Sequence, residues 1–73
     1  MNPSFAISIS FYYQALFNLA LKLTDDEFWA DIITLETLEA QYQIDELKNS
    51  EFLMIFLLED LKNRCNLYNM VQA

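Results

Sequence analysis

Residues 23–28 carry the strongest local folding signal in this chain. Thr24 and Glu27 are spaced as in a capping box, in which the side chains of the N-cap and third helical residues bond to free backbone amides. The apolar residues Leu23 and Phe28 flank the box at the positions of a hydrophobic staple. The pattern predicts that a helix begins at residue 25 and that the preceding element ends near residue 22.

The segment before this boundary fits two patterns. Apolar side chains recur every three or four positions, and Pro3 suits the first turn of a helix, so a helix over residues 3–22 is favoured. The recurring residues are Phe5, Ile9, Tyr12, Leu16, Leu19 and Leu23. Residues 5–13 also contain the alternation typical of a strand. Because no second alternating run could pair with it, a strand here would have to pair with another chain.

A second helix is predicted over residues 25–43. Its larger apolar side chains fall on one side, which we expect to face the core. They are Phe28, Ile32, Leu35, Leu38 and Tyr42. We expect the opposite side to be polar, with Glu36, Glu39, Gln43 and Glu46. The apolar phase slips after Tyr42, so we expect a bend or a short break near residues 41–45.

A third helix is predicted over residues 51–68, after a helix end and a new cap at Lys48, Asn49 and Ser50. Residues 52–58 are all apolar, and the helical period continues to Tyr68. A helix that is apolar on every side must be covered on nearly every side. We expect the tail after residue 66 to fray. The expected fold is a single all-α domain over residues 1–73, a small self-associating bundle of three or four helices.

The apolar content is high for a chain of this length. Apolar residues make up 55% of the 73 residues, whereas a domain of this size buries only about 60–65% of the surface of its unfolded chain. We therefore expect apolar surface used for homo-oligomerisation or for a partner. The first 21 residues carry no charged side chain, but polar residues interrupt them and no basic cluster flanks them, which disfavours a membrane span.

Three residue types limit the chemistry of this chain, because it has no histidine, no glycine and one cysteine. A Cys/His zinc site, a His-activated nucleophile and a glycine-rich phosphate loop are thereby excluded. The carboxylates fall on the expected polar face or in a first helical turn, where acidic residues are ordinary. We expect no enzyme activity, no cofactor and no metal. A lone Cys65 indicates a buried thiol and a reducing, cytoplasmic setting.

The formal charge is −7, from 11 acidic and 4 basic residues. This charge opposes direct nucleic-acid binding and favours contact with basic surfaces. The expected partner interface has an apolar part and an acidic part. The apolar part is Trp29, Phe52, Ile55 and Phe56, and the acidic part is Asp31, Glu36, Glu39 and Glu46.

Two functions fit these features. The first is a non-enzymatic acidic regulator or inhibitor of a larger protein, such as a nucleic-acid-handling protein whose basic cleft the chain would occupy. Phage-encoded and mobile-element antagonists are the expected biological type. The alternative is a structural subunit or obligate oligomer of a larger complex, including a membrane-associated one.

Overall fold

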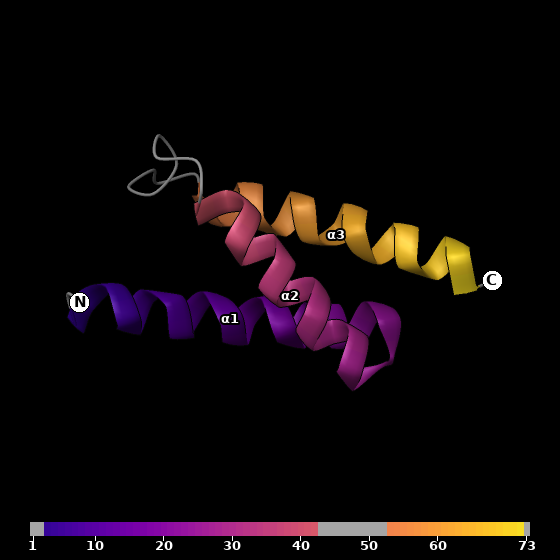
Figure 1. Ribbon diagram of the computed structural model, residues 1–73, viewed down its shortest axis with the longest axis horizontal. Coiled ribbons are helices and arrows are strands. Elements are labelled where there is room, and N and C mark those ends of the chain that lie inside the picture. Colours follow the sequence, from indigo (N-terminus) through magenta and orange to yellow (C-terminus); the bar gives the residue numbers. More distant parts are fainter. Residues whose placement is uncertain (1–2, 43–52, 73) are drawn as a thin grey trace.

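The computed structural model describes residues 3–42 and 53–72, which form three helices and no strand. Helix α1 spans Pro3–Thr24, α2 spans Glu27–Tyr42 and α3 spans Leu53–Gln72. Figure 1 shows α1 and α3 along the long axis, with α2 crossing both at an angle. The all-α bundle is confirmed, and residues 5–13 are helical, so the strand alternative is wrong.

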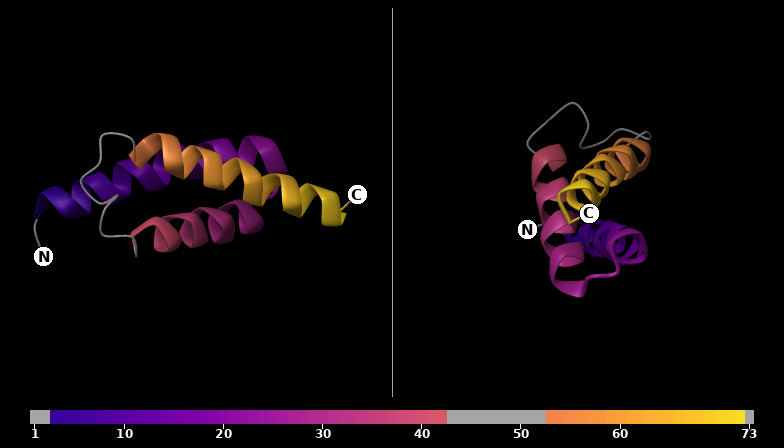
Figure 2. Two further views of the ribbon diagram at one scale, coloured as in Figure 1. Left: turned by 90° about the horizontal axis from the view of Figure 1, so that it is seen from above. Right: turned by 90° about the vertical axis from the view of Figure 1, so that its right-hand side faces the viewer.

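The three helices pack against one another in every pairing. Seen end-on in Figure 2, they form a triangle rather than a flat layer. The molecule is elongated, with extents of 41 × 20 × 16 Å. The start of α1 and the end of α3 lie at opposite ends of this long axis (Figure 1). Each of these two helix ends therefore extends past α2.

The turn between α1 and α2 differs from the predicted capping box. Helix α1 continues through Thr24, whose hydroxyl donates to the Ala20 carbonyl at 2.8 Å. Asp25 adopts a left-handed conformation with φ of 56°. The Asp26 carboxylate accepts the Trp29 backbone N–H at 3.1 Å, so Asp26 is the N-cap of α2. The prediction of Thr24 as N-cap, with a helix from residue 25, is wrong by two residues.

The physical reason is that an aspartate at a helix junction can end one helix or cap the next. It tolerates the left-handed conformation that ends a helix, and it caps the next helix at least as well as threonine. Two consecutive aspartates therefore let α1 run two residues longer than predicted. With Asp26 as the N-cap, Leu23 and Phe28 no longer hold the positions of the predicted staple, and they are 39% and 68% exposed.

The core lies where the three helices meet. Its most buried apolar side chains are Leu16, Ala20, Ala30, Ile33, Leu38, Leu53, Leu57, Leu61 and Cys65. Helix α3 supplies a regular ridge with a spacing of four residues, from Leu53 to Cys65. Cys65 is fully buried, as predicted, and burial raises the pKa of its thiol.

Helix α2 is rotated relative to the predicted core face. Phe28 and Leu35, predicted to be buried, are 68% and 51% exposed, whereas Thr34 and Thr37 are fully buried. The predicted burial of Leu38 is confirmed. The inner face combines short side chains with Ile33 and Leu38, and the Thr37 hydroxyl donates to the Ile33 carbonyl at 2.7 Å. Side-chain size alone therefore does not decide which face of α2 is buried.

Helix α3 also departs from its predicted bounds. It continues to Gln72, four residues past the predicted end, so the expected fraying after residue 66 is wrong within the described residues. The predicted start at residue 51 and the predicted cap at Lys48, Asn49 and Ser50 lie outside the described residues. The predicted bend falls mostly there too, and residues 41 and 42 belong to α2. No described helix is both long and apolar enough to cross a bilayer.

Candidate protein-binding surface

The outward face of α2 carries a row of apolar side chains, Phe28, Ile32 and Leu35, which we call the α2 stripe. Their spacing of four and three residues places them within about 60° of arc on the helix. Phe28 and Leu35 are 68% and 51% exposed, and Ile32 is half-buried. Adjacent large apolar side chains facing water are typical of an interaction site.

An open groove runs beside the α2 stripe, between the first half of α2 and the second half of α3. Its volume is about 410 Å³. It is lined by Trp29, Ile33, Glu36, Arg64, Leu67, Tyr68, Val71 and Gln72. The Phe28 ring packs edge-on against Trp29, with centroids 5.8 Å apart and an interplanar angle of 88°. The stripe and the groove therefore adjoin, and together we call them the docking surface.

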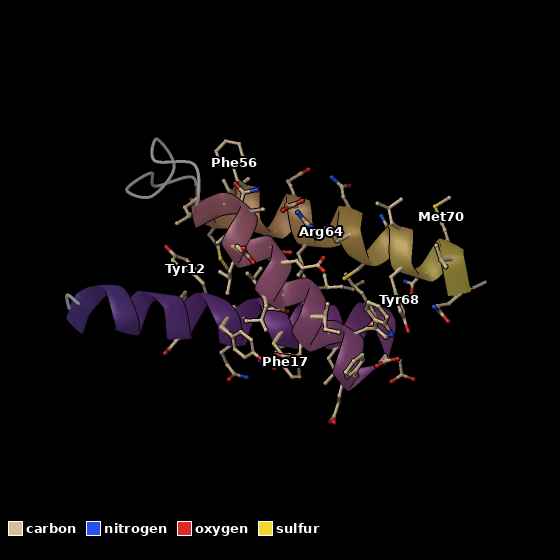
Figure 3. The ribbon with its side chains drawn as sticks, viewed as in Figure 1. Tyr12, Phe17, Phe56, Arg64, Tyr68 and Met70 are labelled. Atoms are coloured by element: carbon tan, nitrogen blue, oxygen red, sulfur yellow. The ribbon has the colours of Figure 1, made fainter. Side chains whose placement is uncertain are left out.

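Tyr68 fixes one end of the groove. Figure 3 shows it pointing from α3 toward the first turn of α2. Its ring lies 5.6 Å from that of Trp29, and its hydroxyl donates to the Asp26 carboxylate at 3.0 Å. The Asn69 side chain donates to the Leu23 carbonyl at 3.0 Å. The last turns of α3 are thus tied to the α1–α2 turn, which gives the groove a defined shape.

These contacts shift two pKa values. The Trp29 backbone N–H and then the Tyr68 hydroxyl stabilise the charged carboxylate, so the pKa of Asp26 is lowered. The pKa of Tyr68 is raised, first by desolvation and then by its hydrogen bond to Asp26. Both shifts favour the pair of charged carboxylate and neutral phenol at neutral pH.

Carboxylates border the α2 stripe. Asp31 lies on the side facing α1 and accepts the Tyr13 hydroxyl, which raises the pKa of that tyrosine. Glu36 lies on the side facing α3, where its carboxylate is 3.4 Å from the Arg64 guanidinium. Glu39 is exposed at the far end of the stripe. The acidic side chains therefore surround the apolar stripe instead of forming a separate polar face.

Arg64 lines the groove and is held by two acids. Its Nε lies 3.1 Å from the Asp60 carboxylate, which also accepts the Gln41 side-chain amide at 3.4 Å. Figure 3 shows Arg64 between α3 and α2, as its contact with Glu36 requires. One cation shared by two carboxylates leaves this border of the groove with net negative charge.

The structure separates the predicted interface residues. Trp29 is 40% exposed and lines the groove. Ile55 and Phe56 are 56% and 44% exposed in the first turn of α3, and Figure 3 shows Phe56 pointing away from α1 and α2. Phe56 precedes Tyr68 by 12 residues, or about 18 Å along the helix. Phe52 and Glu46 lie outside the described residues.

The sequence-based prediction missed four residues of the docking surface. Phe28 and Leu35 were assigned to the core, and Leu67 and Val71 fell in or beside the tail expected to fray. The helical period contained a usable signal, because Val71 follows the buried Leu53 by 18 residues, or five full turns. Val71 therefore continues the inward face of α3 beyond its cover, and it is 81% exposed.

Other kinds of site have little support in the described part of the chain. No cluster of three or more potential ligand side chains is placed there to hold a metal ion. Comparisons with protein-family models, curated proteins and solved structures found no match to this chain. The docking surface is therefore the feature of the described residues that points to a function.

Proposed function

We propose that this protein acts by contact with another protein, without catalysis, as a regulator or inhibitor of a larger partner. The observation that carries the proposal is the docking surface. It places the exposed apolar side chains of α2 beside a groove whose α3 wall is fixed by Tyr68 and Asn69. When another protein covers an apolar surface of this kind, the surface is removed from water and the free energy of the complex is lowered.

The available energy supports a specific contact. Complete burial of a large apolar side chain stabilises by about 1.5–3 kcal/mol. Phe28, Leu35, Leu67 and Val71 are 68%, 51%, 62% and 81% exposed, so most of that gain is still available at each. Because Tyr68 and Asn69 already hold the groove in shape, less conformational entropy is lost on binding.

The charge supports the kind of partner. A chain of net charge −7 is attracted to basic surfaces, and attraction of this type speeds and orients association. Proteins that handle nucleic acids carry such surfaces. An acidic protein that occupies a basic cleft in place of a nucleic acid would act as an inhibitor, as a phage-encoded or mobile-element antagonist does.

A second candidate function is a structural subunit or an obligate oligomer. It is favoured by Ile55 and Phe56, which expose a separate apolar area at the opposite end of α3. A chain with apolar areas at two places can bridge two neighbours in an assembly. This candidate predicts that the isolated chain self-associates.

Site-specific photo-crosslinking in the cells that make the protein tests the proposed function. A photoreactive phenylalanine analogue is placed at Phe28 in the full chain. The matched control places it at Phe11 on α1, which is 64% exposed, against 68% for Phe28. We expect position 28 to give one predominant adduct with a different polypeptide and position 11 to give little. Equal labelling of many proteins from both positions would contradict the proposal, and adducts between copies of this chain would favour the second candidate.

A further inference from the structure

The docking surface limits the chemistry of its occupant. We infer that it receives an amphipathic helix of another protein, with apolar side chains against the α2 stripe and groove and with lysine or arginine along its flanks. This inference rests on the proposed contact function and names the partner's chemistry. Its evidence is the shape of the surface and the distribution of charge around it.

The shape suits a helix. Phe28, Ile32 and Leu35 repeat with the four- and three-residue spacing by which one helix packs its ridges against another. The groove beside them is bounded by two helices and is open along one side. An amphipathic helix laid in such a groove presents its own apolar row to the stripe. A flat or extended partner would leave the groove between Trp29 and Val71 unfilled.

The charges surround the stripe on three sides. With 100° per residue, Asp31 lies about 60° from Phe28 on one side and Glu36 about 80° on the other. Glu39 lies about 20° from the line of Phe28, beyond Leu35. Helix α2 contains four acidic residues and no lysine or arginine. Covering the stripe desolvates these carboxylates, of which Asp31 and Glu36 already have partners in Tyr13 and Arg64. A partner that brings cations to the edges offsets this cost better than a neutral one.

The basic residues of the described part do not supply those cations. Arg64 is engaged by Asp60 and Glu36. Lys62 is exposed on α3, about 120° around the helix from Tyr68 and thus away from the groove. Lys22 belongs to the last turn of α1. In the described part of the chain, Arg64 is thus already shared by two carboxylates, and a partner with basic flanks would complement the α2 stripe.

The same charges disfavour three other occupants. Two copies facing each other through α2 would bring four acidic residues from each copy together without a cation from either helix, and like charges in an interface are costly. A nucleic acid and an anionic membrane would both be repelled by the same carboxylates. A cationic helix is the occupant that satisfies both the apolar stripe and its acidic border.

Two synthetic helical peptides of about 18 residues, or five turns, test the inference with the full chain. Both contain the same leucine row, and one has lysine flanks where the other has glutamate. Trp29 is the only tryptophan of the chain and lines the groove, so its emission reports binding, and calorimetry gives the stoichiometry. We expect one lysine peptide per chain, a blue shift of Trp29 emission and at least about tenfold weaker binding of the glutamate peptide. Raising salt from about 0.05 M to 0.5 M should weaken the lysine peptide several-fold.

Matched variants separate the docking surface from general charge attraction. Glu39→Gln is compared with Glu59→Gln, because Glu59 is also exposed but lies half a turn from Tyr68 on α3. Leu35→Ser is compared with Ile55→Ser, whose native side chains are 51% and 56% exposed. We expect Glu39→Gln to weaken the lysine peptide about threefold and Leu35→Ser about tenfold, with both α3 variants unchanged.

The remaining outcomes would overturn the inference, each for a different reason. Equal binding of both peptides, or no binding of either, would contradict the cationic helix. Equal losses in Glu39→Gln and Glu59→Gln would show diffuse charge attraction. A position-28 crosslink to a partner without a basic helix would overturn this inference and leave the proposed function intact, whereas the absence of a specific crosslink would remove the proposed function itself.

Discussion

Asp26 links α2 to α3 through its side chain, at the turn that follows α1. It follows the left-handed Asp25 at the end of α1, caps α2 through the Trp29 N–H and accepts the Tyr68 hydroxyl of α3. The groove depends on this residue, because Trp29 and Tyr68 are two of its lining side chains. A single carboxylate therefore links the stability of the bundle to the shape of the docking surface.

This arrangement predicts an acid-dependent loss of stability. The folded pKa of Asp26 lies below its unfolded value, so its contribution is present above the unfolded pKa and is lost as pH falls through the folded pKa. We expect Asp26→Asn to unfold at lower urea concentration than the wild type at about pH 7, and the difference to shrink toward about pH 3. Tyr68→Phe removes one of the two hydrogen bonds and should reproduce part of the difference. If the difference in unfolding urea concentration between the wild type and Asp26→Asn were independent of pH, this role of Asp26 would be contradicted.

Thr34 presents a different residue-scale feature. It is fully buried, and its hydroxyl has no hydrogen-bond partner among the described residues. We expect Thr34→Val, which keeps the shape, to raise the free energy of unfolding by about 1 kcal/mol, because an unsatisfied buried group is removed. Thr37→Val is the matched control, since Thr37 is equally buried but bonded to the Ile33 carbonyl. Equal effects of the two substitutions in urea denaturation would argue against an unsatisfied hydroxyl at Thr34.

At the scale of the helices, α2 has two apolar faces, one in the core and one in the docking surface. The inner face, which includes Ile33 and Leu38, belongs to the core, while the outer face carries Phe28 and Leu35. Helix α3 likewise has an inward ridge from Leu53 to Cys65, and beyond it Val71 is 81% exposed. Both helices thus provide apolar side chains to the docking surface after their own core contacts are made.

Because the two faces of α2 differ in burial, substitutions on them should differ in their effect on the free energy of unfolding. Leu38 is 6% exposed and Leu35 is 51% exposed. We expect Leu38→Ala to lower the free energy of unfolding by about 2–4 kcal/mol and Leu35→Ala by less than about 1 kcal/mol. Chemical denaturation of both variants checks this. Equally large losses in the two variants would mean that α2 is oriented as its apolar pattern predicts, with both leucines in the core.

The helices were largely predictable from sequence, whereas the rotation of α2 was not. Helical spacing and cap residues locate three helices because these signals are local. The core face of α2 depends on how closely its neighbours approach, and a pattern of large apolar side chains does not contain that information. The groove was missed for the same reason, because Trp29 and Val71 are brought together only by the packing of α2 on α3.

At the scale of the whole molecule, shape and charge act together. The bundle is about twice as long as it is wide, and the docking surface lies toward the end where α3 extends past α2 (Figure 1). A net charge of −7 keeps like molecules apart at low salt and attracts a basic partner. We therefore expect the isolated chain to be monomeric and its docking surface to be open to a different protein.

The mass of the purified full chain in solution, measured by light scattering at low salt, tests this claim most directly. We expect the mass of one chain for the wild type and for Leu35→Ser alike, because the α2 stripe is open in the isolated protein. A stable dimer that Leu35→Ser converts to monomer would contradict the account, since the stripe would then be covered by a second copy of the same chain.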